Sequence, residues 1–164
     1  MMPYTATDWE ELVRRQENRL YRAALAILGS APEAEDAVQE AFLALWEKGP
    51  ADLRDEGAWL MRVLVNRCRS RLRARGRAET LPLWEDLPAP EPEERLELEE
   101  FYALPPQERE AVHLFYYEGY STQEISQIVK CRPGTVRARL SRARARLRTL
   151  LDPSKSVSHN REEH

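Results

Sequence analysis

The sequence is poor in cysteine, histidine and glycine, and it contains no long apolar run. Its two cysteines, Cys68 and Cys131, cannot build a disulfide framework or a zinc site by themselves, and they favour a reducing compartment. Even the longest apolar runs, such as Ala23 to Leu28, are far too short to cross a bilayer. No basic start with a following apolar segment marks a signal peptide. We therefore expect a cytoplasmic protein without membrane insertion.

The arrangements that mark enzymes and metal sites are also missing. His113, His159 and His164 are scattered, and no serine–histidine–aspartate set, phosphate-binding loop or metal-ligand spacing occurs. We therefore predict that the protein is not an enzyme and that it has no catalytic residues, no metal site and no cofactor. Cys68 is interpreted as a small core residue rather than as a redox switch.

The 164 residues suffice for one ordinary domain or two small ones, with 32% charged and 42% apolar residues. Apolar residues recur at helical spacing, and no alternating stretch is long enough for a strand. The sequence therefore predicts an all-α fold. A capping box at Thr7, a second at Ser30 and stops at Gly29 and Gly49 divide the first part of the chain. The helices predicted there cover residues 8–28, 31–48 and 56–75.

A segment rich in proline and acid follows, and it has no helical period. Beyond it, the pattern predicts helices over 93–103, 106–118, 122–129 and 133–151. The last residues have almost no apolar side chains and are predicted to be disordered. The predicted organisation is a first domain over 7–76, a linker over 77–92, a second domain over 93–151 and a tail over 152–164.

The net charge of −3 hides a strong separation of charge along the chain. Residues 67–77 contain six arginines and no acid, and residues 137–148 contain another six and no acid. Residues 79–118, by contrast, contain twelve acids and two bases. Because local charge decides what a surface binds, both arginine segments are candidates for contact with nucleic acid.

The last two predicted helices have the spacing of a helix-turn-helix, with a capping box at Ser121 and a short turn around Lys130. On the last helix, an apolar stripe is formed by Val136, Leu140, Ala143, Leu147 and Leu150. The opposite face combines arginines with small residues, which suits a major groove; it comprises Arg137, Ala138, Ser141, Arg142 and Ala145. An arginine-rich helix can also be a solvated surface, but such a helix usually mixes charges of both signs.

Two further helix faces stand out. The third predicted helix carries a polar face of Arg62, Asn66, Arg69 and Arg73, with Ser70 at its edge. The Asn66 amide can pair with a base edge, although an ordinary exposed asparagine is the alternative. The second predicted helix presents Asp36, Gln39, Glu40, Leu43 and Glu47 on one side. An exposed leucine among acids favours a protein-docking surface, and an ordinary amphipathic helix is the alternative.

These surfaces, in this order, resemble the extracytoplasmic-function (ECF, group IV) sigma factors of the sigma-70 family. The first half resembles their region 2 in RLYRAALAILGSAPEAEDAVQEAFLALWEK and GAWLMRVLVNRCRSRLRARGR. The second half resembles their region 4 in ALPPQEREAVHLFYYEGYSTQEISQIVKCRPGTVRARLSRARARLRTLL. The resemblance implies a region 2 three-helix bundle and a region 4 helix-turn-helix joined by a flexible acidic linker.

The resemblance also implies a function and its residues. Such a factor binds core RNA polymerase and directs it to specific promoters, and an anti-sigma factor is an optional partner. The implied contacts with polymerase are the β flap and the β′ clamp helices, the latter through Asp36, Gln39, Glu40 and Leu43. Recognition of the minus-ten element falls to Arg62, Asn66, Arg69, Ser70 and Arg73. Recognition of the minus-thirty-five element falls to Thr135, Arg137, Ala138, Ser141 and Arg142.

Two departures from the family keep alternatives open. Ser70 stands where relatives commonly have Asp or Asn, and Lys130 stands where they usually have Gly. If the Lys130 position requires a positive φ, a residue with a side chain costs about 1 kcal/mol there. The alternative functions are a stand-alone helix-turn-helix regulator and a sigma-like interaction module without initiation activity.

Overall fold

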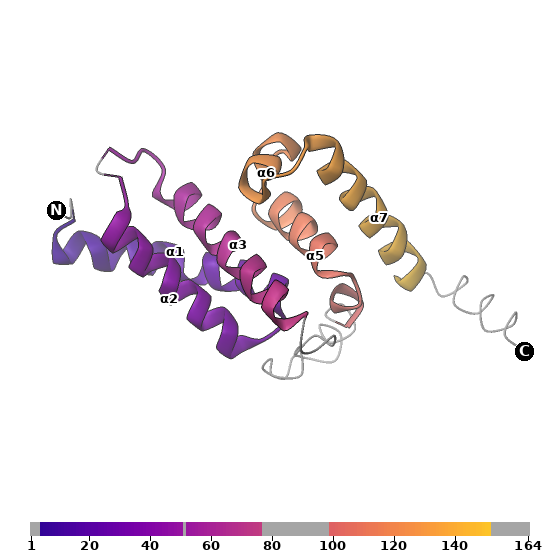
Figure 1. The fold of residues 1–164 in the computed structure, drawn as a ribbon, viewed down its shortest axis with the longest axis horizontal. Helices are drawn as coiled ribbons and strands as arrows, with labels where there is room; N and C mark the ends of the chain where they lie inside the picture. Colours follow the sequence, from indigo (N-terminus) through magenta and orange to yellow (C-terminus); the bar gives the residue numbers. More distant parts are fainter. Residues whose placement is uncertain (1–3, 51, 77–98, 152–164) are drawn as a thin grey trace, which may run out of the picture. The chain divides into compact units, whose positions relative to one another are not determined.

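The computed structural model describes residues 4–50, 52–76 and 99–151, and within these ranges the chain forms helices and connecting loops without a strand. This confirms the predicted all-α fold. The described residues fall into two compact units, one built from the first three helices and the other from most of the chain beyond residue 99 (Figure 1). The predicted linker and tail lie outside the described residues.

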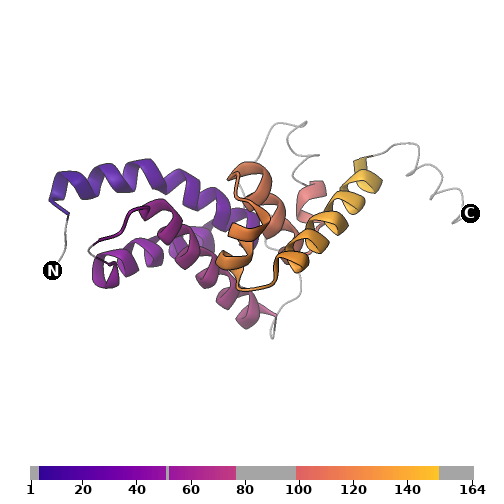
Figure 2. The same ribbon diagram turned by 90° about the horizontal axis from the view of Figure 1, so that it is seen from above.

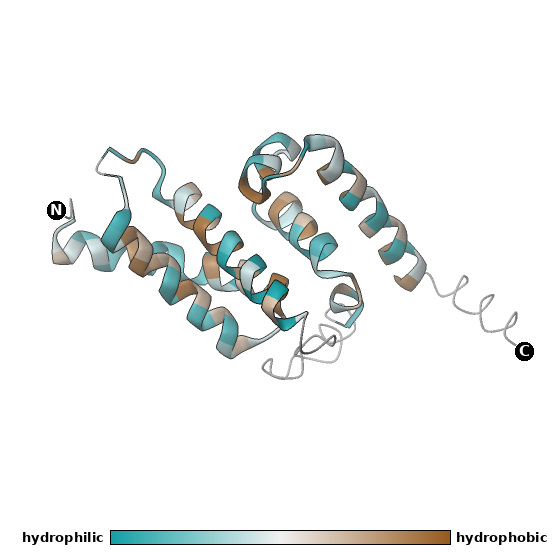
Figure 3. Ribbon diagram, viewed as in Figure 1, coloured by the Kyte–Doolittle hydropathy of each residue, from teal (hydrophilic) through white to brown (hydrophobic). Residues whose placement is uncertain are grey.

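The first unit is a bundle of three helices, α1 (Ala6–Leu28), α2 (Ala31–Lys48) and α3 (Glu56–Arg75). Each of the three helices packs against the other two (Figures 1 and 2). The apolar side of α2 is buried throughout, and it comprises Ala34, Val38, Ala41, Phe42 and Leu45. The hydropathy colouring of Figure 3 shows polar and apolar residues mixed along each helix, as amphipathic helices require.

Side-chain caps set where the helices of the bundle begin. The Ser30 hydroxyl accepts a hydrogen bond from the Glu33 amide at 3.5 Å, which confirms the cap predicted there. The cap predicted at Thr7 is wrong, because the Thr5 hydroxyl accepts from the Asp8 amide at 3.1 Å and α1 begins two residues earlier than expected. Gly29, with φ of 70°, ends α1 in the left-handed conformation and lets the chain turn directly into α2.

The second unit contains α5 (Pro106–Val112), the π-helix η2 (His113–Tyr117), α6 (Thr122–Val129) and α7 (Pro133–Leu151), and residues 99–102 are helical as well. The single helix predicted over 106–118 therefore widens into a π turn, where the Glu118 amide bonds to the His113 carbonyl at 3.1 Å. Gly119, with φ of 76°, follows this turn. α5 packs against α7, so the π turn leads from this packed pair toward α6.

One core assignment differs from the sequence analysis. Leu150 is 42% exposed, although the predicted apolar stripe of the last helix includes it. In the described ranges, no helix has the length and apolar character that a membrane span needs.

Candidate nucleic-acid and protein-docking interfaces

The helix-turn-helix of the second unit is held by local hydrogen bonds. Ser121 and Glu124 form a reciprocal capping box at the start of α6: the Ser121 amide donates to Glu124 Oε1 at 2.9 Å, and the Glu124 amide donates to Ser121 Oγ at 3.1 Å. Lys130 adopts φ of 57°, and the Cys131 amide bonds to the Ser126 carbonyl at 3.0 Å. This is the Schellman arrangement that turns a chain sharply out of a helix. The positive φ expected at Lys130 is confirmed.

α7 presents the predicted recognition face away from its packed side. Val136, Leu140 and Ala143 are buried, whereas the side chains of Arg137, Ser141 and Arg142 are exposed. Thr135 and Ala138, which complete the predicted set, are half-buried. Small residues between exposed guanidinium groups let a helix backbone approach the edges of bases.

Other arginines of the same helix are used inside the unit. The Arg144 Nη1 atom donates to the Tyr116 hydroxyl at 3.0 Å, and Arg146 Nε lies 3.0 Å from the Glu108 carboxylate. The arginines of α7 therefore fall into two groups. Some guanidinium groups hold η2 and α5, while Arg137 and Arg142 face solvent.

The predicted polar face of α3 is present in the first unit. Arg62, Ser70 and Arg73 are exposed, and Asn66 and Arg69 are half-buried. Arg73 Nη2 donates to the Ser70 hydroxyl at 3.1 Å, so the two side chains act together on the surface. Hydroxyl, amide and guanidinium groups on one helix face can contact phosphates and base edges of DNA.

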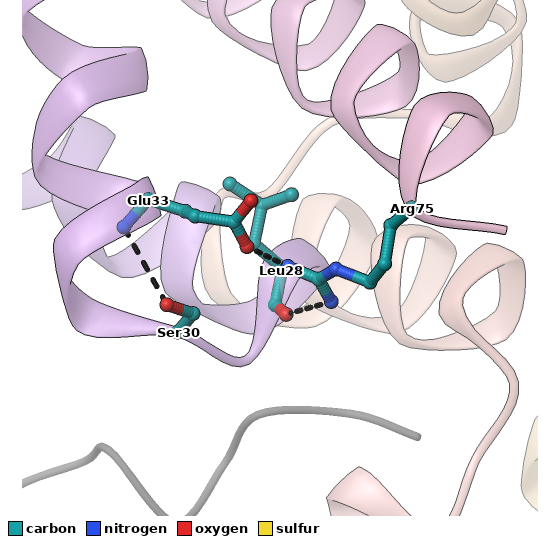
Figure 4. A network of polar contacts seen from close by, with 4 residues as sticks. All are labelled: Leu28, Ser30, Glu33 and Arg75. Carbon is teal, nitrogen blue, oxygen red and sulfur yellow. Dashed lines mark hydrogen bonds and ion pairs between the residues drawn. The ribbon is translucent and has the colours of Figure 1, made fainter. Parts of the chain in front are cut away.

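α3 also contains two arginines whose structural role the sequence analysis missed. Arg71 Nη2 donates to Glu40 on α2 at 2.7 Å. Arg75 Nη1 donates to the Leu28 carbonyl at 2.7 Å and its Nη2 pairs with Glu33, as Figure 4 shows. Helical spacing in the sequence could have revealed this role. Arg71 and Arg75 lie on the same side of α3 as the buried Leu64 and Cys68.

The predicted docking face of α2 borders an open apolar groove between α1 and α2. Leu43 is 54% exposed and Trp46 is 43% exposed, although both are large apolar side chains. Trp46 was missed in the sequence, and its ring packs edge-on against Trp9 at 4.9 Å between centroids. The groove is lined by Trp9, Val13, Glu17, Val38, Gln39, Phe42, Leu43 and Trp46. Exposed apolar side chains gathered in one groove are typical of a protein-binding surface.

The four residues predicted for docking do not all behave alike. Gln39 and Leu43 line the groove, and Asp36 is exposed one helical turn away. Glu40, by contrast, is turned toward α3, where its carboxylate accepts a hydrogen bond from Arg71.

No cluster of three or more histidine, cysteine or acidic side chains suited to a metal ion occurs within residues 4–50, 52–76 and 99–151.

Comparison with known proteins identifies the family. The family described as "Sigma-70 region 2" matches residues 12–78, and "Sigma-70, region 4" matches residues 102–147. The ECF RNA polymerase sigma factor SigM of Mycobacterium tuberculosis is 32% identical over 151 residues, which cover 87% of this chain and 76% of SigM. The chain belongs to the ECF sigma factors. This confirms the resemblance stated from the sequence.

Other members of the family are similar to this sigma factor as well. The ECF sigma factor SigE of Mycolicibacterium smegmatis is 37% identical over 165 residues, covering 88% of this chain and 62% of SigE. The sigma factor RpoE of Bartonella quintana, solved in complex with the anti-sigma factor NepR, matches with a TM-score of 0.66 and 27% identity. That match covers 89% of this chain and 98% of RpoE.

Proposed function

We propose that this sigma factor binds core RNA polymerase and directs it to specific promoters, without an enzymatic activity of its own. The observation that carries the proposal is that each arginine segment contains two kinds of arginine. In α3 and in α7, some arginines pair with acceptors of their own unit, while others, Arg62, Arg137 and Arg142, are exposed. Outward guanidinium groups on two helices supply two separate contacts for a polyanion.

In this proposal α7 recognises the minus-thirty-five element from the major groove. Arg137 and Arg142 supply guanidinium groups that reach guanine edges or phosphates, and Ser141 contacts either. Thr135 and Ala138 line the same face near the start of the helix, where a recognition helix contacts bases.

α3 recognises the minus-ten element. Asn66 contacts a base edge through its amide, while Arg62 and Arg69 hold phosphates on either side. The exposed pair of Ser70 and Arg73 supports this proposal, because their mutual hydrogen bond orients the guanidinium before DNA arrives.

The groove between α1 and α2 docks the β′ clamp helices of core polymerase. Leu43 and Trp46 supply apolar area, and Gln39 and Asp36 supply polar contacts at the rim. Contact of the second unit with the β flap stays a prediction from the family. We also propose an anti-sigma factor as a regulatory partner, supported by the complex of the similar RpoE with NepR.

Run-off transcription with purified core polymerase tests the proposal. The template is a library of promoters with randomised minus-ten and minus-thirty-five elements. We expect transcripts from a subset of templates only when the chain is added. Operator-like DNA binding without polymerase, and no transcripts, would instead support a stand-alone helix-turn-helix regulator. Polymerase capture without transcripts would support an interaction module.

A further inference from the structure

The end of α3 continues its buried side with arginine instead of leucine. Leu64 and Cys68 are fully buried on this side. One turn further, Arg71 donates to Glu40 of α2 at 2.7 Å, and another turn on, Arg75 pairs with Glu33. Arg75 also caps the end of α1 through the Leu28 carbonyl (Figure 4). The side chains of Arg71 and Arg75 are 25% and 11% exposed, and those of their partners Glu40 and Glu33 are 41% and 30% exposed, so both pairs are partly buried.

The two pairs together fix how α3 sits on α2. Arg75, the later arginine in α3, pairs with Glu33, the earlier glutamate in α2. This order is what two antiparallel helices require. Sliding α3 by one turn, about 5.4 Å, or rotating it by one residue, about 100°, would break both pairs. Partly buried polar pairs are known to select one register among several that an apolar interface would accept.

The side of α3 that these pairs fix lies opposite the side proposed to read DNA. Arg62, Asn66 and Arg73 lie about 140° to 180° around the helix from Arg71 at 100° per residue. Any rotation of α3 on α2 would therefore turn the DNA-reading face by the same angle. A misplacement of about 1 Å in a recognition contact is costly, so a fixed rotation matters for base discrimination.

We propose that Arg71 and Arg75 are positioning residues for DNA recognition by α3, and that Glu40 is the anchor of Arg71 on α2 rather than a polymerase contact. This inference rests on the proposed reading of the minus-ten element by α3. Gln39, next to Glu40, lines the docking groove, so the Glu40–Arg71 pair links the docking helix directly to the reading helix.

The test replaces the pair with apolar side chains of similar length, Glu40→Met with Arg71→Met, in the full chain bound to core polymerase. The readout is the ratio of run-off transcription from a selected promoter to that from the same promoter with a mutated minus-ten element. We expect this ratio to fall about tenfold, the size of one lost base contact. Capture of core polymerase and the melting temperature should stay the same or rise, because apolar replacements of such pairs are often neutral or stabilising. A merely structural pair would leave the ratio unchanged, whatever happens to the melting temperature.

The matched control reverses the pair as Glu40→Arg with Arg71→Glu. We expect it to restore both the parental ratio and polymerase capture. If the methionine double variant folds and keeps the parental transcription ratio, the positioning role is overturned. If the methionine variant does not fold, a reduced ratio in a folded reversed variant overturns it instead. Loss of polymerase capture in the reversed variant would overturn the reassignment of Glu40. A parental chain that drives transcription without any dependence on the minus-ten element would contradict the proposed reading by α3 itself, independently of these variants.

Discussion

The Nε atom of Arg146 on α7 lies 3.0 Å from the carboxylate of Glu108 on α5, and the Glu108 side chain is only 6% exposed. Arg142, one turn earlier on α7, is exposed. The Arg146 side chain is itself 55% exposed, so the two arginines differ in their partners rather than in their exposure. Arg146 compensates a buried negative charge, whereas Arg142 is available to an external anion.

Replacement of Arg142 by alanine should weaken binding to a preferred minus-thirty-five duplex by about 1 to 3 kcal/mol and relax the base preference there. The measurement is fluorescence anisotropy with the preferred duplex and a set of single-base variants. Arg146→Ala is the control: it should keep the base preference but lower the stability of the second unit by about 1 kcal/mol, because Glu108 loses its partner. Equal loss on every duplex for both variants would argue against the recognition role of Arg142.

Asp36→Arg and Gln39→Ala should reduce capture of core polymerase, since each changes a polar contact at the rim of the α1–α2 groove. Pull-down with purified core enzyme measures the capture. Binding of isolated minus-thirty-five duplex should be unaffected. Glu11→Arg, an exposed charge reversal on α1 outside the groove, serves as the matched control. Capture that is unchanged in both groove variants would remove the docking assignment.

Lys130→Gly should stabilise the protein by about 1 kcal/mol, because glycine adopts the observed φ of 57° without the steric cost of a Cβ atom. Lys130→Ala removes the same charge but keeps the Cβ atom, so it should bring no gain. Denaturant unfolding followed by circular dichroism compares the three proteins. A gain of the same size in both variants would attribute the effect to charge rather than to the backbone.

The affinity for duplex DNA should fall steeply with salt, by about 0.9 log units per tenfold salt for each phosphate neutralised. Arg137→Ala should reduce the steepness of this dependence by about 0.9, the contribution of one phosphate contact. The reason is that Arg137 is exposed on the proposed groove-facing side of α7. Titrations at several salt concentrations measure the slope. A response to salt that is flat in the parental protein would contradict contact with the DNA backbone.

Helix boundaries were predictable where a local signal acts alone. Ser30 before α2 and Gly29 after α1 set those boundaries as expected, because a side-chain cap and a left-handed glycine need only neighbouring residues. At the start of α1 two threonines compete. Thr5 caps, so α1 begins two residues earlier than expected, and the Trp9 amide bonds to the Thr5 carbonyl. The π turn at His113–Tyr117 has the same apolar spacing as an α-helix and left no signal in the pattern.

The candidate site was predictable in its faces but not in its internal contacts. The exposed positions of α3 and α7 follow from helical periodicity, which sequence shows directly. Which arginine is paired depends on residues far away in the chain: Arg75 meets Glu33 forty-two residues away, and Arg146 meets Glu108 thirty-eight residues away. From the sequence alone, all arginines of a segment therefore look equally available for DNA. In the fold, some of them are paired with distant acids.

Site-specific photo-crosslinking in the assembled complex tests the central claim most directly, namely that α3 and α7 contact DNA at two separate elements while α2 holds polymerase. A benzoylphenylalanine replaces Ser70 in one variant and Ser141 in another, since both positions are exposed. With core polymerase and a selected promoter, the probe at position 70 should label the minus-ten element and the probe at position 141 the minus-thirty-five element. Labelling of one shared DNA segment by both probes, or of protein alone, would contradict the account.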